Sequence, residues 1–282
     1  MKIGVALPTV GLDHSADLLL PVAEAAERLG FDSVWATDHA LMSYERESQY
    51  PYGHSGTEIA LNPGIGWLEP LSALSFVAAR TERVGLGTSV LVLPYRNPVL
   101  VASQAATLHL LSGDRLILGV GAGWMREEFK ALGLDPAERG ARTDEYLAVL
   151  RTLWRDDPAS FEGRFVSFED VVLGLPPRDS APPLWVGGNT RAALRRALRH
   201  GDGWHGFEVY PEDIAAVRAQ LAEPPRRWAA TPPSSSCRSC AGWSRRGGRR
   251  RASSRAAATS EHRRGRWSRS CVATRRRGWD SW

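Results

Sequence analysis

Residues 82–124, ERVGLGTSVLVLPYRNPVLVASQAATLHLLSGDRLILGVGAGW, contain two short apolar runs separated by a longer segment of helical period. The runs are Val84–Thr88 and Leu116–Val120, and the helical segment between them is Val99–Leu111. Short runs rich in Val, Leu and Ile, with little alternation, are typical of strands buried on both faces of a parallel sheet. A strand, a helix and a second strand in this order predict a βαβ unit.

The same alternation continues on both sides of this unit. Further strands are predicted at Ile3–Pro8, Ser33–Thr37, Leu184–Val186 and near Gly203–Gly206. Further helices are predicted at Asp17–Leu29, Leu71–Arg80, Thr143–Leu153, Arg191–Arg199 and Glu212–Leu221. Six βα units within residues 1–223 predict an α/β fold, a TIM-type (β/α)8 barrel truncated to about six units. An eight-stranded barrel would need two more, and its active site would lie at the carboxyl ends of the strands.

Charge divides the chain into two parts. Residues 1–223 hold 20 Lys and Arg against 29 Asp and Glu, whereas residues 224–282 hold 16 Arg, no Lys and two acids. The mildly acidic first part lacks the basic balance typical of nucleic-acid-binding or membrane-binding proteins. No apolar run reaches the roughly 18 residues of a membrane span. We therefore expect a cytoplasmic protein with a small-molecule substrate, no membrane partner and no nucleic acid, and a homo-oligomer stays open.

Residues 224–282 are predicted to form a disordered tail. From Pro225 onward they include no Leu, Ile, Phe, Tyr or Met, and such a chain cannot offset the roughly 1–2 kcal/mol per residue that ordering the backbone costs. One interpretation is a basic arm that binds nucleic acid. The interpretation that we favour is translation out of frame, which would make the chain as written an inactive truncated product. Joining the third base of each codon to the next two forces Gly at Trp228–Ala229 and at Trp279–Asp280, and permits a helix and a buried strand over 259–282.

Four stretches together carry the pattern of a known family. They are GFDSVWATDH (30–39), residues 82–124, RGARTDEYLAVLRTLW (139–154) and PPLWVGGNTRAALRRALRHGDGW (182–204). From residue 1 to about 223 the chain resembles the luciferase-like monooxygenase family, in particular its branch of coenzyme F420-dependent oxidoreductases. The resemblance implies a deazaflavin (F420) or flavin enzyme that transfers hydride to or from a small organic substrate. An FMN-dependent luciferase-like monooxygenase is the alternative, because one fold serves both activities.

His39 is the candidate catalytic residue. It follows Asp38 at the end of the second strand, and histidine is the side chain that exchanges a proton near neutral pH. The resemblance puts His39 beside the cofactor ring and Asp38 in the cofactor site; a histidine that merely bonds a neighbouring carbonyl is the alternative. The resemblance also implies a cis peptide bond between Ser89 and Val90, in a bulge that backs the central ring of the cofactor. Two ordinary strand-end residues are the alternative there.

Two glycine-rich strand ends complete the predicted cofactor site. Its residues at these ends are Gly121, Ala122, Gly123, Gly187, Gly188 and Asn189. At the first end, missing side chains would let backbone N–H groups approach the cofactor, although a tight exit from the strand would look the same. At the second end, two glycines and a capping residue before a helix predict a phosphate site. An ordinary Asn N-cap is the alternative.

Three further features bear on the substrate and on metals. Trp124 stands where family members that act on sugar phosphates have a glutamate, and this departure argues against a sugar-phosphate dehydrogenase. The long connection 42–69 is typical of a functional loop, and its aromatic residues either line a substrate pocket or pack on one another: Tyr44, Tyr50, Tyr52 and Trp67. No metal site is predicted, because the remaining histidines have no partners at ligand spacing; they include His54, His109 and His200.

Overall fold

The structure is a computed structural model, and it describes residues 2–11, 15–45, 47–51, 66–174 and 181–222. By its contacts the chain divides into a first unit, residues 1–228, and a second unit, residues 229–282. The second unit lies outside the described residues. The predictions of a disordered tail, of an arm that binds nucleic acid and of a change in reading frame over 224–282 therefore fall outside them as well.

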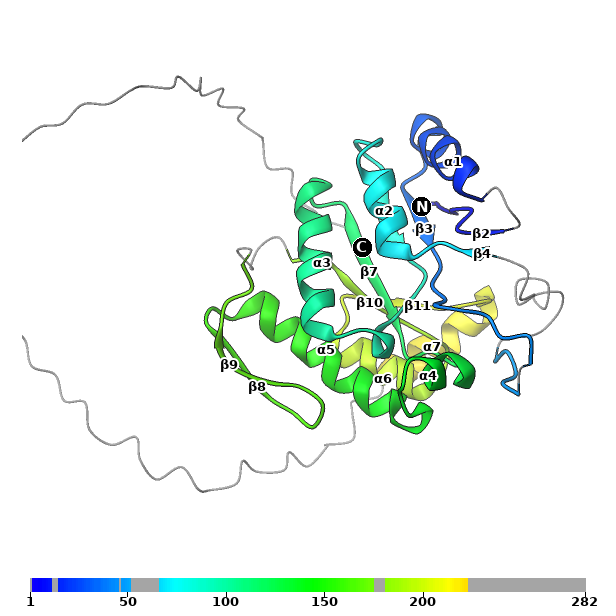
Figure 1. The fold of residues 1–282 in the computed structure, drawn as a ribbon. Coiled ribbons are helices and arrows are strands. Elements are labelled where there is room, and N and C mark those ends of the chain that lie inside the picture. The colour runs from blue at the N-terminus through cyan, green and yellow to red at the C-terminus, as the bar shows by residue number, and fades with distance from the viewer. Residues whose placement is uncertain (1, 12–14, 46, 52–65, 175–180, 223–282) are drawn as a thin grey trace, which may run out of the picture. The chain divides into compact units, whose positions relative to one another are not determined.

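Six parallel strands form the centre of the first unit (Figure 1). They are β1 (Gly4–Ala6), β3 (Ser33–Ala36), β5 (Gly85–Thr88), β7 (Leu116–Gly121), β10 (Leu184–Gly187) and β11 (Gly203–His205), and each is paired with the next in this order. A short strand, β6 (Leu91–Val92), pairs in parallel with the end of β7. Within the described residues β1 and β11 are the edges of the sheet. This parallel half-barrel confirms the predicted truncated barrel and each predicted strand.

Helices follow the strands and cover one face of the sheet, with α2 and α3 in front of it in Figure 1. They are α1 (Ser15–Leu29), α2 (Pro70–Ala78), α3 (Pro98–Leu111), α5 (Arg139–Arg155), α6 (Arg191–His200) and α7 (Pro211–Ala222), which confirms the six predicted helices. Local sequence explains where they begin. In α3, the Asn97 side chain accepts the N–H of Val99 at 2.9 Å, and Pro98 takes the first helical position, where its missing N–H is no loss.

Several shorter elements were not predicted. They are the antiparallel pair β2 (Val10–Gly11) and β4 (Gly66–Trp67), the 3₁₀ turns η2 (Leu93–Tyr95) and η3 (Pro136–Glu138), the helix α4 (Arg126–Ala131), and the hairpin of β8 (Ala159–Glu162) and β9 (Ser167–Val171). Segments of two to six residues are too short for a hydrophobic period to be visible. None of the described helices is both long and apolar enough to cross a membrane.

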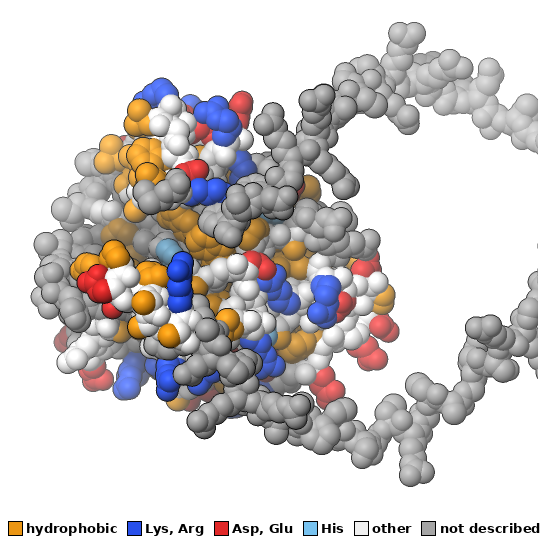
Figure 2. All heavy atoms as spheres, turned by 180° about the vertical axis from the view of Figure 1, so that it is seen from behind, with side chains coloured by type: hydrophobic (Ala, Val, Ile, Leu, Met, Phe, Trp, Pro, Cys, Tyr) orange, Lys and Arg blue, Asp and Glu red, His pale blue; other side chains and the backbone are white. Residues whose placement is uncertain are grey.

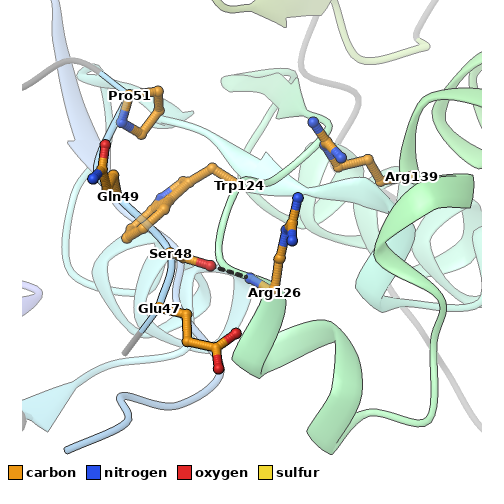
Figure 3. Close-up of a pocket in the computed structure, with 7 residues that line it drawn as sticks. All are labelled: Glu47, Ser48, Gln49, Pro51, Trp124, Arg126 and Arg139. Carbon is orange, nitrogen blue, oxygen red and sulfur yellow. Dashed lines mark hydrogen bonds between the residues drawn. The ribbon is translucent and has the colours of Figure 1, made fainter. Parts of the chain in front are cut away.

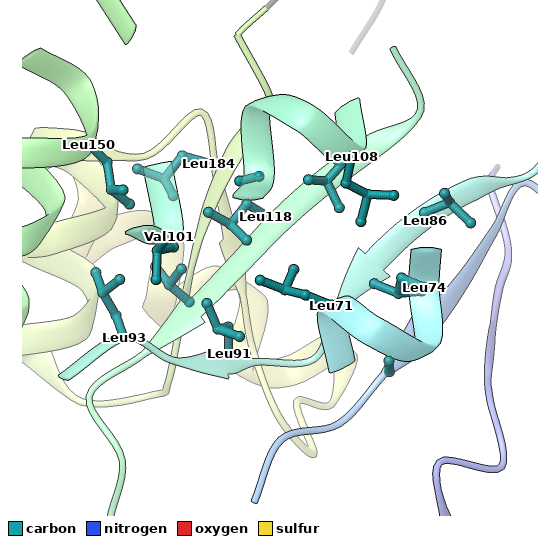
Figure 4. Close-up of a cluster of buried hydrophobic side chains, with 14 of the residues drawn as sticks. Leu71, Leu74, Leu86, Leu91, Leu93, Val101, Leu108, Leu118, Leu150 and Leu184 are labelled. Carbon is teal, nitrogen blue, oxygen red and sulfur yellow. The ribbon is translucent and has the colours of Figure 1, made fainter. Parts of the chain in front are cut away.

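The hydrophobic core lies between the sheet and the helices that cover it. Side chains that point outward from the strands meet side chains from α2, α3 and α5, as Figure 4 shows. Completely buried members are Leu74, Leu86, Val101, Leu118, Leu150 and Leu184. Burial of each such side chain contributes about 1.5–3 kcal/mol, so the outward faces of the strands anchor the half-barrel.

The inner face of the sheet is built from glycines and aromatic rings. A Cβ at Gly87 would lie 2.2 Å from Cε3 of Trp35, and a Cβ at Gly203 would lie 2.7 Å from Nε1 of Trp185. Each tryptophan therefore lies across a glycine of a neighbouring strand, and both are only half-buried. The strands are thus less evenly buried than predicted, because the helices cover the outer face alone. Figure 2, turned to the reverse side, shows hydrophobic side chains gathered across the middle of the molecule.

Candidate active site

The ends of four strands bring the predicted residues to one edge of the sheet. His39, Ser89, Gly121 and Gly187 lie at or just beyond the carboxyl ends of β3, β5, β7 and β10. Because these strands are parallel and adjacent, their ends form one rim, and the Ser89 N–H reaches the Ala36 carbonyl across it at 2.7 Å. We call this rim, defined by His39, Ser89, Gly121 and Gly187, the mouth.

Val90 is packed against two glycines of the mouth. The Ser89–Val90 peptide bond is cis, which confirms the bond that the resemblance implied. A Cβ at Gly121 would lie 2.6 Å from Cγ2 of Val90, and a Cβ at Gly187 would lie 2.8 Å from its Cγ1. Side chains cannot approach that closely, so glycine at both positions makes room for Val90. The predictions for the two glycines were different: Gly121 opens the backbone to the cofactor, and Gly187 belongs to a phosphate site.

Ser89 is held by a histidine that the sequence analysis did not single out. The Oγ of Ser89 and Nε2 of His205 are 2.8 Å apart. Burial lowers the pKa of His205 below its ordinary value of 6.5, so the ring that shares this hydrogen bond with the Ser89 hydroxyl is neutral near pH 7. His205 also stacks on Trp35, with ring centroids 5.2 Å apart. The imidazole therefore fixes the Ser89 side of the bulge.

His39 forms a hydrogen-bonded pair with Glu128, which comes from α4. Nδ1 of His39 lies 2.9 Å from Oε2 of Glu128, whose side chain is completely buried. The same carboxylate accepts the N–H groups of Ala40 at 2.7 Å and Leu41 at 3.3 Å, and the hydroxyl of Tyr95 at 2.9 Å. Burial and the neighbouring Glu128 carboxylate raise the pKa of Tyr95 above its ordinary value, so Tyr95 remains a donor. Glu128 thus accepts from four donors.

This pair determines which ring nitrogen of His39 carries a proton. A carboxylate can only accept hydrogen bonds, so Nδ1 donates to Glu128 and Nε2 is the nitrogen that can exchange a proton. The side chain of His39 is 10% exposed. Its ring packs edge-on against Trp67 at 4.4 Å and Trp124 at 5.9 Å between centroids. An imidazole with a fixed tautomer at the rim of a barrel is suited to general acid–base catalysis.

Asp38 has its carboxylate engaged inside the protein. Its two oxygens accept from Nη1 and Nη2 of Arg96 at 2.6 and 2.9 Å, and one of them also accepts the Val92 N–H at 2.7 Å. Arg96 makes a second ion pair with Glu69 at 3.0 Å. Both oxygens of the buried Asp38 are therefore occupied. The Asp38 carboxylate thus holds the backbone next to His39 against Val92 and Arg96. The resemblance implied instead that Asp38 takes part in the cofactor site.

The predicted phosphate site before α6 differs in detail from the expectation. The N-cap is Thr190, whose hydroxyl accepts a first-turn N–H at 3.2 Å, so the alternative of an Asn N-cap is wrong. The side-chain amide of Asn189 pairs with the backbone of Phe207 at 2.6 and 3.1 Å, and the Gly188 N–H donates to the His205 carbonyl at 3.1 Å. These groups tie α6 to the connection after β11, so the Gly188 N–H and the Asn189 side chain are hydrogen-bonded within the protein.

Ala122 and Gly123 carry the chain out of β7. Gly123 has a φ of +73°, a conformation that glycine adopts without strain. A Cβ there would lie 2.6 Å from Cγ1 of Val92, and Ala122 is half-buried beside it. These contacts describe the tight exit from the strand that was the alternative for this segment. The turn sets the direction of Trp124 toward His39.

Aromatic side chains form a wall beside His39. Trp124 contacts both His39 and Tyr50, the latter with ring centroids 5.3 Å apart, and Tyr50 reaches Phe207 at 6.2 Å. Trp67 also packs edge-on against His39, with ring centroids 4.4 Å apart. Its indole N–H is buried and has no hydrogen-bond partner among the described residues. The wall can thus exclude water from one side of His39 and still offer a polar contact.

A pocket of about 420 Å³ adjoins this wall (Figure 3). It is lined by Glu47, Ser48, Gln49, Pro51, Trp124, Arg126 and Arg139. The loop on one side is tied to α4, since Oγ of Ser48 accepts the Arg126 N–H at 2.9 Å and Oε1 of Glu127 accepts the Glu47 N–H at 2.8 Å. The loop at Glu47 and Ser48 and the helix α4 therefore form two sides of the pocket, and hydrogen bonds join them.

Three further features of the sequence concern metal binding and the aromatic loop 42–69. In the described part of the chain, no group of three His, Cys, Asp or Glu side chains could hold a metal ion. Tyr44 is 87% exposed, so it does not line the mouth. His54 and Tyr52 lie outside the described residues.

Glu128, Tyr95 and His205 were missed by the sequence analysis. A signal for Glu128 exists in the sequence: Met125 and Phe129 are spaced by one helical turn and are completely buried. A helix of six residues offers too few repeats for that spacing to predict a buried face. Tyr95 and His205 have no local signal, because their partners come from distant parts of the chain.

Comparison with known proteins finds several relatives. The model of the luciferase-like monooxygenase family matches residues 1–242. An uncharacterised protein of Mycobacterium tuberculosis is 37% identical over 202 residues, which cover 72% of this chain and 69% of the relative. The F420-dependent glucose-6-phosphate dehydrogenase of Amycolatopsis mediterranei is 32% identical, covering 73% of this chain and 59% of the enzyme. The crystal structure of monooxygenase RslO1 from Streptomyces bottropensis aligns with a TM-score of 0.62 and 28% identity, over 78% of this chain and 64% of that one. The chain thus spans less than two thirds of the latter two proteins.

Proposed function

Because this chain belongs to the luciferase-like monooxygenase family, we propose that it is an F420-dependent oxidoreductase with a small organic substrate. The observation that carries the proposal is His39 at the mouth, with Nδ1 fixed by the buried Glu128. The F420-dependent relative supports the choice of cofactor. When bound, the deazaflavin supplies or takes up a hydride.

The residues of the mouth fit a flat ring system. Ser89 and Val90 are half-buried at the bulge. Because positions 121 and 187 are glycine, the Val90 side chain can pack against both of them. The buried indole N–H of Trp67 offers a donor beside His39 for which the described part of the chain supplies no acceptor. We propose that the bulge backs the ring, that the turn 121–123 lines it, and that the segment 187–189 holds the phosphate.

In this proposal His39 exchanges the proton that accompanies hydride transfer. Nε2 accepts the hydroxyl proton of an alcohol substrate as it is oxidised, or donates a proton to the oxygen of a carbonyl substrate as it is reduced. Glu128 holds the imidazole in the tautomer that leaves Nε2 to the substrate. The wall formed by Trp67 and Trp124 keeps water from the ring. The indole of Trp124 beside His39 favours a substrate with an apolar part over a sugar phosphate.

Titration with two cofactors tests the proposal. The purified chain is titrated with F420 and with FMN, each followed by the change in cofactor fluorescence. We expect F420 to bind and FMN to bind at least tenfold more weakly. Tight binding of FMN alone would favour the alternative, an FMN-dependent monooxygenase. A chain that binds neither would support the reading of an inactive truncated product.

His39→Ala then separates catalysis from binding. A proton-transfer group contributes mainly in the transition state, so we expect kcat to fall by about 10²-fold or more while the Kd for F420 changes little. Arg195→Gln, an exposed residue on α6, is the control. Equal turnover in wild type and His39→Ala would refute the role of His39.

We further propose a barrel domain over 1–223 and an out-of-frame segment over 224–282. The composition of the segment supports this reading, since it holds 16 Arg and no Lys. Resequencing the gene around the codon for Glu223 is the test. An insertion or deletion that restores a Leu- and Val-containing continuation is expected. An unchanged reading, together with salt-dependent binding of nucleic acid that is lost on deleting 224–282, would instead favour the basic arm.

A further inference from the structure

From the pocket next to the mouth, defined by Trp124, Arg126 and Arg139, we infer that the substrate is a flat organic molecule that carries a carboxylate. This inference rests on the proposed function, because it assigns the substrate class of the same site. It is carried by two arginines that have no acidic partner among the described residues, by an indole that joins the pocket to His39, and by the direction of the side chains around them.

Arg126 and Arg139 differ from the other arginines near this part of the fold. Arg96, Arg142 and Arg196 each form an ion pair with a carboxylate at 2.6–2.9 Å. Within the described residues, neither Arg126 nor Arg139 forms one. The side chain of Arg139 donates one hydrogen bond, to the Pro136 carbonyl at 3.0 Å, which leaves other guanidinium donors. Two guanidinium groups that line one pocket without a bound acid attract an anion.

The acidic residues at this pocket do not cancel the two arginines. Figure 3 shows the guanidinium groups of Arg126 and Arg139 on the same side of the pocket, and the Glu47 carboxylate directed away from them. The Glu127 carboxylate accepts the N–H groups of Glu47 and Ser48 at 2.8 and 3.1 Å. Burial opposes ionisation of Glu127, but those bonds lower its pKa below the ordinary value. The ionised carboxylate therefore holds the loop at Glu47 and Ser48 against α4. The side of the pocket that holds the guanidinium groups is therefore positive.

Trp124 connects the positive side of the pocket to the catalytic histidine. Its ring lines the pocket and packs edge-on against His39 with centroids 5.9 Å apart. A flat molecule stacked on the indole can thus place a carboxylate at Arg126 and Arg139 and its reactive group toward His39. The volume of about 420 Å³ is that of a site for a small organic molecule. A carboxylate can accept two parallel hydrogen bonds from the fork of guanidinium donors.

Binding of matched probes tests this inference without any need for turnover. The full chain is titrated with naphthoate, with the neutral naphthamide of the same shape, and with glucose 6-phosphate, each by calorimetry. We expect naphthoate to bind about tenfold or more tightly than naphthamide, since hydrogen bonds to a charged group are worth about 1.5–3 kcal/mol. Arg126→Gln and Arg139→Gln should each weaken naphthoate about tenfold and leave naphthamide unchanged. Arg195→Gln, which removes the same charge from exposed α6, should change neither.

Three outcomes would contradict the inference, and a fourth would separate it from the proposed function. Equal affinity for naphthoate and naphthamide would show that the pocket does not recognise the negative charge of the ligand. Tighter binding of glucose 6-phosphate would replace the flat carboxylate with a sugar phosphate. If the arginine variants weaken F420 and not naphthoate, the arginines hold the anionic side chain of the cofactor. Failure of F420 to bind, with arginine-dependent naphthoate binding intact, would refute the proposed function and leave the anion pocket standing.

Discussion

Replacing Glu128 by glutamine should reverse the tautomer of His39. The change keeps the size of the side chain but turns one acceptor oxygen into an NH₂ donor. The remaining oxygen can still accept the N–H groups of Ala40 and Leu41, which lie 2.7 and 3.3 Å from Oε1. The new NH₂ group then faces Nδ1 of His39 and the hydroxyl of Tyr95, both of which donate at 2.9 Å in the wild type. Both partners must become acceptors.

The cost of this reversal follows from those bonds. Tyr95 can rotate its hydroxyl, whereas His39 must move its proton from Nδ1 to Nε2. The loss of charge-assisted hydrogen bonds should lower the free energy of unfolding by about 1–3 kcal/mol. A proton on Nε2 stops the ring from accepting the substrate hydroxyl, so kcat for alcohol oxidation should fall by about 10²-fold or more. Glu128→Gln and His39→Ala both act on catalysis through the same imidazole. The variant that combines them should therefore be as slow as His39→Ala alone.

Two measurements check this prediction. The nitrogen chemical shifts of His39 report the tautomer, and single-turnover kinetics with F420 report the hydride-transfer rate. Glu145→Gln is the matched control, because that carboxylate of α5 also accepts several backbone N–H groups, including that of Phe165 at 2.8 Å, but contacts the connection between β8 and β9 and not the mouth. A glutamine variant that keeps the proton on Nδ1, or a double variant much slower than His39→Ala, would refute the reasoning.

Three further predictions follow from the mouth. Gly121→Ala should push Val90 from its seat, since the new Cβ would lie 2.6 Å from Cγ2, and should cost about 1–3 kcal/mol of stability; Val90→Ala in the same chain should recover part of the loss in a denaturant melt. Asp38→Ala should lower the free energy of unfolding by about 3–5 kcal/mol, because it leaves Arg96 partly buried without its bidentate partner; Arg96→Leu combined with it should be less damaging than Asp38→Ala alone. Burial lowers the pKa of His205 below 6.5, so unfolding takes up a proton below that pH: thermal stability should be constant above about pH 7 and fall as pH falls below 6.5. His205→Gln should flatten that dependence, and an unchanged profile would contradict it.

The elements that could be predicted from the sequence are those with several repeats of a period. β7 spans six residues and α3 spans 14, which is long enough for an apolar pattern to be read. α4 spans six residues, fewer than two turns, and the residues of the β8–β9 hairpin show no apolar run. The half-barrel was therefore predictable, whereas the elements that surround its mouth were not.

The candidate site was predictable where one strand end determines a residue's place. His39 and Ser89 follow strands, and parallel order alone brings them to one rim. The partners of these residues could not be predicted, because Glu128 is 89 residues from His39 and His205 is 116 residues from Ser89. Likewise, Gly187 is glycine because of Val90, a contact that no local pattern in the sequence indicates.

Hydrogen–deuterium exchange with and without F420 tests the central claim most directly. The account predicts that saturating F420 slows amide exchange at the three strand ends 89–92, 121–124 and 187–190, and leaves the hairpin 159–171 unchanged. FMN at the same concentration should protect these segments less, because we expect it to bind more weakly. Protection confined to the hairpin or to the outer helices, or no protection at the strand ends under conditions where F420 is bound, would contradict the assignment of the cofactor to this mouth.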